Sequence, residues 1–70
     1  MNIDEASAKL VVERVVHAMD LLNQSAGTVR EKCDEATFSD YQLKAAILIS
    51  NIEDELLKPI YRQYLHLRPY

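Results

Sequence analysis

Small and apolar residues recur with helical spacing through the first half of the chain. The spacings alternate between four and three residues, at Ala8, Val12, Val15, Met19, Leu22, Ala26, Val29 and Cys33. This pattern indicates one long helix that packs along a narrow stripe against a neighbouring helix. We predict that the helix begins near Ile3, with Asn2 as its N-cap, and runs to about residue 34. Cys33 is then expected to be a small core residue.

Gly27 is the one position that argues against a continuous first helix. The segment from Asn23 to Thr28 has the composition of a helix end, with Gly27 as a left-handed terminator. The apolar spacing, however, keeps its register through Ala26 and Val29, which a break would disturb. We predict a continuous helix weakened at Gly27, and the alternative is a chain of three helical segments.

A second helix is predicted to start after a loop at residues 34–38. Ser39 can cap it, Gln42 can complete a capping box, and Phe38 with Leu43 can form a hydrophobic staple. The apolar face that follows consists of Tyr41, Ala45, Leu48, Ile49, Ile52, Leu56, Ile60 and Tyr64. Pro59 cannot continue an undisturbed helix, so the helix is expected either to kink there or to stop and restart in a new turn.

These two helices predict an all-α fold, a single helical-hairpin domain over residues 1–70 with two long antiparallel helices and a kinked or separate C-terminal turn. The predicted hairpin core consists of Val12, Val15, Met19, Leu22, Val29, Phe38, Leu43, Leu48, Ile49, Ile52 and Leu56. A chain of this size forms a marginal core by itself. Its apolar stripe is also wider than one neighbouring helix can cover, so we expect a partner to cover the rest.

The predicted contact residues fall on the first helix, outside its core positions, and in the C-terminal tail. The tail from Pro59 to Tyr70 holds three of the four tyrosines, and tyrosine is enriched at interface hot spots. The candidate partner-interface residues are Val11, Val16, Leu21, Tyr61, Tyr64, Leu65 and Leu67. The alternative for the tail is that Tyr61, Tyr64 and Leu65 pack on the hairpin's own core.

Composition argues against most other classes of protein. Eleven acidic and eight basic residues give a net charge of −3 without a basic cluster, so neither nucleic acid nor an anionic membrane is an expected partner. The single cysteine, the single glycine and an isolated Glu13–His17–Asp20 group provide no metal site, no phosphate loop and no catalytic set. We expect no enzyme and no cofactor. The acidic start and the absence of a long apolar run favour a cytoplasmic protein.

The segment around Asp40-Tyr41-Gln42, together with the chain length, the long first helix and the tail Pro59 to His66, resembles a known family. It is similar to the small helical-hairpin co-chaperones of type III secretion needle subunits, which serve a virulence-associated export system. The resemblance implies a non-catalytic hairpin that pairs with a larger chaperone of tetratricopeptide-like repeats. Through that partner it would help to keep the needle subunit soluble before export. Gly27 and Pro59 depart from the family pattern.

Two other functions remain open on the sequence alone. A homodimer could form a four-helix bundle that acts as a regulator or antitoxin-like binding protein, burying the same apolar positions. An enzyme subunit with a shared pocket would need convergent charged residues, and the sequence does not place them on one face. The mass of the purified chain in solution separates the homodimer from the co-chaperone.

Overall fold

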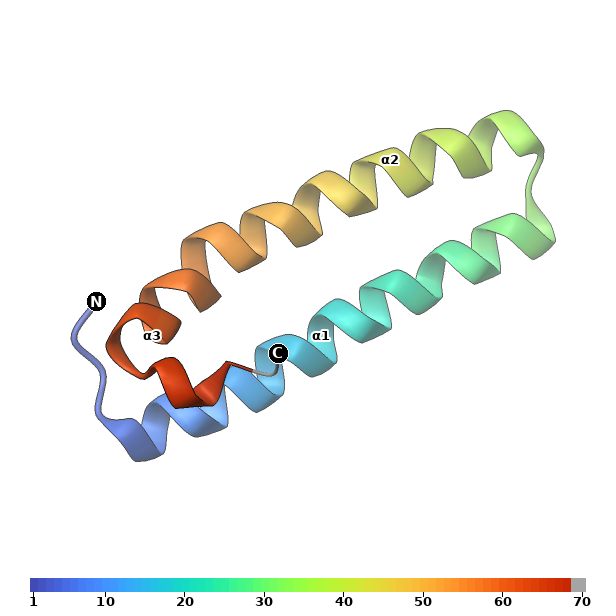
Figure 1. Ribbon diagram of the computed structural model, residues 1–70. Coiled ribbons are helices and arrows are strands. Elements are labelled where there is room, and N and C mark those ends of the chain that lie inside the picture. The colour runs from blue at the N-terminus through green and yellow to red at the C-terminus, as the bar shows by residue number, and fades with distance from the viewer. Residues whose placement is uncertain (69–70) are drawn as a thin grey trace.

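A computed structural model, which describes residues 1–68, shows that the chain folds as a helical hairpin (Figure 1). Helix α1 (Glu5–Lys32) and helix α2 (Glu35–Ile52) run antiparallel and are joined by two residues. A π-helical turn, η1 (Glu53–Leu57), a short helix, α3 (Lys58–Gln63), and a 3-10 turn, η2 (Leu65–Leu67), complete the chain. The all-α hairpin with a separate C-terminal turn is therefore confirmed. Pro69 and Tyr70, the end of the predicted tail, lie outside the described residues.

Aspartates begin both long helices, in place of the caps expected from the sequence. The Asp4 carboxylate accepts a hydrogen bond from the Ser7 backbone N–H at 3.0 Å, and Asp34 accepts one from Thr37 at 2.8 Å. Each carboxylate satisfies an N–H that lacks a helical partner and lies at the positive end of the helix dipole. Asn2 and Ser39 were therefore wrong as caps. Capping at Asp34 shortens the predicted loop to Cys33 and Asp34 and places Ser39 inside α2.

Helix α1 continues without a break through Gly27, as predicted. No residue among those described has a positive φ, so Gly27 does not act as a left-handed terminator. The helix ends at Lys32, and Cys33 caps its C-terminus and is exposed. The prediction of Cys33 as a core residue is therefore wrong, because the helix ends before that position can turn inward.

The π-helical turn η1 accommodates Pro59 at the end of α2. An α-helix through this point would require an N–H that proline lacks and would press its ring against the Glu55 carbonyl. Instead, the Lys58 N–H donates to the Glu53 carbonyl, five residues back, and Pro59 falls in the first turn of α3. The wider turn inserts one residue into the helical register. Leu57 is therefore buried, with 3% of its surface exposed, while the predicted core residue Leu56 is 42% exposed.

The best-buried core lies at the open end of the hairpin. There Leu57, Ile60 and Tyr61 pack with Ala8 and Val12 of α1. Figure 1 shows the red C-terminal segment folded back over the blue beginning of α1. Farther along the hairpin, Ala45 is the one buried apolar residue of the described part of α2.

The predicted core is confirmed in part. Val12 is buried, and a larger group is half-buried between the helices: Val15, Met19, Leu22, Val29, Phe38, Ile49 and Ile52. Leu43 and Leu48 were wrong as core residues, as was Leu56, because all three are exposed. Leu43 lies two residues from the inward-facing Ala45, which turns it to the far side of α2.

Truncation of Ile60, which is 1% exposed, is expected to cost about 2–5 kcal/mol of unfolding free energy. That loss is comparable to the whole stability of a core this small, so Ile60→Ala is expected to be largely unfolded. Urea unfolding followed by circular dichroism measures the difference. Leu65→Ala, at a position 68% exposed, is the control and should unfold at nearly the wild-type midpoint. Equal midpoints for the two variants would contradict the placement of the core.

Gly27→Ala is expected to stabilise the chain by about 1 kcal/mol, because alanine favours the helical backbone that Gly27 already adopts. Apart from its chain neighbours and the backbone of its own helical turns, a Cβ atom at this position would meet no heavy atom within 4 Å. The same urea experiment measures the change. A lower midpoint for the variant would show that Gly27 is not helical in solution.

Stability is expected to fall as the pH drops through the range in which the two capping aspartates protonate. Hydrogen bonds from Thr37, through its side chain and then its backbone N–H, hold the pKa of Asp34 below its ordinary value of 3.8, and Ser7 does the same for the pKa of Asp4. A lowered folded-state pKa stabilises the native state above about pH 4, and protonation removes that contribution below it.

The double variant Asp4→Asn/Asp34→Asn tests this assignment, because asparagine caps a helix well and does not titrate. Its midpoint in urea should change less between pH 6 and pH 3 than that of the wild type. An unchanged difference between the two pH values would mean that other groups cause the acid sensitivity.

Candidate protein-interaction surface

Four large apolar side chains near the middle of the hairpin are each more than half exposed. They are Leu21 of α1 and Leu43, Ile47 and Leu48 of α2, and we call them the mid-hairpin patch. Leu43 and Ile47 are four residues apart, so they are neighbours on one helix face. Exposed apolar groups that lie together on a soluble chain mark interaction sites more often than single ones do.

A hydrogen bond between the helices shows that Leu21 and Leu48 lie on the same side of the hairpin. The Ser25 hydroxyl donates to the Leu22 carbonyl, which leaves its oxygen to accept from the Tyr41 hydroxyl. Leu21 is one turn before Ser25, and Leu48 is two turns after Tyr41. Both leucines therefore flank this bond on one side, whereas Leu43 and Ile47, each two residues from the inward-facing Ala45, lie farther around α2 on the side away from α1.

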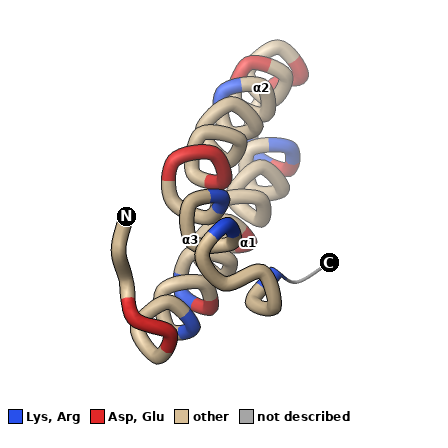
Figure 2. The backbone as a smooth tube through the Cα atoms, turned by 60° about the vertical axis from the view of Figure 1, so that its left-hand side comes forward, with Lys and Arg blue, Asp and Glu red and all other residues tan. Residues whose placement is uncertain are grey.

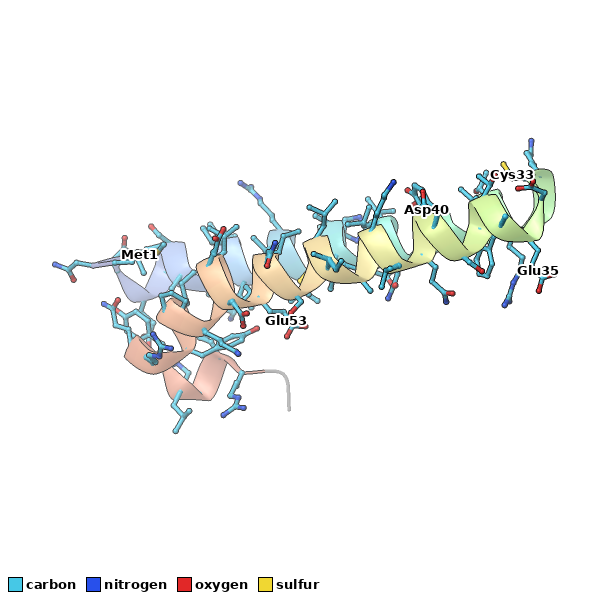
Figure 3. All side chains as sticks on the ribbon, turned by 90° about the horizontal axis from the view of Figure 1, so that it is seen from above. Met1, Cys33, Glu35, Asp40 and Glu53 are labelled. Carbon is cyan, nitrogen blue, oxygen red and sulfur yellow. The ribbon has the colours of Figure 1, made fainter. Side chains whose placement is uncertain are left out.

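Contacts near the closed end of the hairpin fix the positions of α1 and α2, which carry the mid-hairpin patch, relative to each other. Besides the Ser25–Tyr41 bond, the Arg30 guanidinium lies over the Phe38 ring, 4.7 Å from its centroid. Such cation–π contacts contribute about 0.5–1 kcal/mol at exposed sites. Figure 3 places Cys33 and Glu35 at this closed end and Met1 at the open end.

Charged residues border the patch on α2. Lys44 and Asp40 form an exposed ion pair at 2.8 Å, one turn apart. An exposed pair of this kind adds little stability. Its position beside Leu43 and Leu48 gives an apolar centre with a polar edge, which is the usual arrangement of a protein interface.

The molecule exposes more surface than a compact chain of its mass. Its accessible surface is 5249 Å², whereas a compact monomer of 8.1 kDa exposes roughly 4,500 Å². The radius of gyration is 14.6 Å, against roughly 11 Å for a compact chain of this length. The difference of roughly 750 Å² approaches the share of about 800 Å² that one partner buries in a standard interface.

The residues predicted as an interface divide between the core and the surface. Val16, Leu21 and Leu65 are exposed, while Val11, Tyr64 and Leu67 pack against the core, and Tyr61 is buried within it. For Tyr61 and Tyr64 the structure therefore confirms the alternative that the tail packs on the hairpin, whereas Leu65, which that alternative also placed in the core, is exposed. Sequence reasoning missed Ile47 as an exposed residue and placed Leu43 and Leu48 in the core.

The tail also ties the two ends of the chain together. The Gln63 amide nitrogen donates to the Ile3 carbonyl at 2.8 Å, and the Tyr64 hydroxyl donates to the same carbonyl at 2.9 Å. His66 contacts Glu5 at 2.9 Å. The sequence could not indicate these contacts, because they join residues about sixty positions apart.

Neither a metal centre nor a membrane-spanning helix is found in the part of the chain that the structure describes. Within residues 1–68, no three His, Cys, Asp or Glu side chains come together in a way that could hold a metal ion. Over the same residues, no helix combines the length and apolar character needed to cross a bilayer.

Models of known protein families, curated proteins and solved structures were each compared with this chain, and no match was found. The class that the fold defines is therefore an all-α helical hairpin. Its functional assignment depends on the surface described above.

Proposed function

We propose that this chain is a non-catalytic protein-binding module, and that the mid-hairpin patch is where a helical partner docks. The observation that carries the proposal is the exposure of Leu21, Leu43, Ile47 and Leu48 together on two connected helices. Amphipathic helices commonly bind by laying such a face into a partner's groove.

The partner that best fits this surface is a concave one. Full burial of a leucine or isoleucine contributes about 1.5–3 kcal/mol, so half-exposed residues of the patch gain about half of that each. The four together supply about 3–6 kcal/mol before the costs of association. A nanomolar complex requires about 12 kcal/mol, so a tight partner must also cover surface outside the patch. A helical-repeat protein can enclose several faces of a narrow hairpin at once.

We therefore propose a co-chaperone role in the bacterial cytoplasm. The hairpin would pair with a larger chaperone of tetratricopeptide-like repeats and thereby help to hold a type III secretion needle subunit soluble until export. The resemblance at Tyr41-Gln42 and in the tail supports this assignment, and so does the hairpin architecture. Gly27 and Pro59 remain departures from the family pattern, although α1 continues through Gly27 as a straight hairpin requires.

Replacing the outer part of the patch is expected to abolish partner binding and leave the hairpin folded. In Leu43→Gln/Ile47→Gln both changes lie on the exposed side of α2, and glutamine is a good helix former. Co-expression with the repeat chaperone and needle subunit of a type III secretion system from the same genome should yield a ternary complex with the wild type and not with the double variant.

Leu10→Gln is the matched control, because Leu10 is also about half exposed but lies on α1, outside the patch. Circular dichroism should give the same helix content for all three proteins. Retention of the complex by the double variant would contradict the role of the patch. Failure of the wild type to form any complex would contradict the co-chaperone assignment.

A homodimeric four-helix bundle with a regulatory or antitoxin-like role is the second candidate. The observation in its favour is the elongated shape of the hairpin, whose extents are 45 × 18 × 16 Å. One long side thus spans roughly 800 Å², the area that one partner contributes to a standard interface. Light scattering with size-exclusion chromatography of the chain alone decides between the two, since a concentration-independent dimer would favour the bundle.

A further inference from the structure

Charge is divided unevenly along this chain. Residues 1–55 contain five basic and eleven acidic side chains, a net charge of −6, whereas residues 56–70 contain three basic side chains and no acidic one. In Figure 2 the described C-terminal segment from α3 onward is blue at intervals and nowhere red. An acidic chain therefore ends in a segment with a charge of +3.

The three basic residues of this segment line one hollow. Lys58, Arg62 and Arg68 surround it together with Tyr61 and Leu65, and its volume is about 250 Å³. This volume lies below the usual range of small-molecule pockets, so the hollow suits a side chain better than a larger ligand. We call it the basic hollow.

The side chains of the basic hollow favour a carboxylate. Lys58 already binds the Asp54 carboxylate at 2.6 Å, which shows that this position accepts such a group. Arg62 is exposed one turn farther along α3, and a guanidinium can bind a carboxylate through two parallel hydrogen bonds. Lys58 and Arg62 line the same hollow, so both cations face an anion that enters it.

Apolar surface and nearby acidic residues narrow the choice of ligand further. Leu65 is exposed at the hollow, so an apolar group next to the carboxylate would find a contact. Glu53, Asp54 and Glu55 directly precede the segment and would repel an extended polyanion. Nucleic acid and an anionic membrane are both continuous polyanions, whereas one acidic side chain is not.

We propose that the basic hollow binds an acidic side chain, flanked by apolar residues, on a partner protein. The inference deepens the proposed function and rests on it for the idea that the chain binds a protein. It uses residues of the C-terminal segment that are distinct from the mid-hairpin patch. Because the basic hollow lies toward one end of the hairpin, binding there would also fix the orientation of the partner along the hairpin axis.

Titration of the isotope-labelled full chain with short blocked peptides, followed by NMR, tests this proposal. The probe is acetyl-Leu-Glu-Glu-Leu-amide, and acetyl-Leu-Gln-Gln-Leu-amide is its neutral control. Saturable shifts at Arg62 and Leu65 are expected with the glutamate peptide alone. Raising the sodium chloride concentration should weaken them, because exposed charges are screened.

Arg62→Gln is expected to weaken binding by up to about fivefold, the upper end of the range for an exposed charge pair. Arg62→Lys should recover part of the loss, because it restores the charge without the forked geometry. Lys32→Gln, which removes one positive charge at the far end of α1, is the control and should bind like the wild type.

Equal shifts with both peptides, or none that saturate, would overturn the proposal. Saturation of the same residues by inorganic phosphate or by vesicles of phosphatidylcholine and phosphatidylglycerol at lower concentration would also overturn it, in favour of another anion. The titration uses the chain alone, so a negative titration would contradict the basic hollow as a binding site without contradicting the role of the mid-hairpin patch, which the co-expression of the Leu43 and Ile47 variant tests separately. A negative co-expression result likewise leaves peptide binding intact.

Discussion

Packing of the C-terminal segment on the beginning of α1 closes the end of the hairpin that has no covalent connection. Leu57, Ile60 and Tyr61 supply most of the apolar surface, and Ala8 leaves room for them because its side chain is small. Gln63 and Tyr64 then fasten the backbone at Ile3. Without this contact the two helices would be held together by the two-residue connection and by the half-buried residues between them, and two helices alone bury too little to stay folded.

The geometry at Pro59 makes this closure possible. A straight α2 would carry its last apolar residues along the hairpin axis and away from α1. The π-helical turn shifts the register by one residue, turns Leu57 inward and lets α3 begin in a new direction. A residue that breaks the regular helix is thus also the reason that the open end has a core.

Because the core is concentrated at the open end, few side chains are fully buried in the middle of the hairpin. Between the helices there, apolar residues such as Val15, Met19 and Ile52 are only half-buried, and the mid-hairpin patch lies on the outside. The same chain carries a basic segment on an otherwise acidic molecule. Apolar surface gives affinity and charge gives orientation, so a partner that meets both would be held in one direction.

Local patterns in the sequence determined the helices, because helix formation depends mainly on residues within four positions of each other. The spacing from Ala8 to Val29 identified the inward side of α1 and its continuity through Gly27, and Pro59 marked the restart. The starts of the helices were predicted less well. Ser39 was predicted to cap α2, but Asp34 caps it five residues earlier and thereby adds a turn of backbone hydrogen bonds.

Tertiary structure alone decided which apolar residues are buried. Leu56 and Leu57 have the same side chain, and only the inserted residue of the π-helical turn turns one inward and the other outward. Tyr61 could have served a partner or the core, and its burial depends on α1 residues about fifty positions away. The sequence determined how much apolar surface the chain carries, but the packing of η1 and α3 on α1 decided how much of it stays exposed.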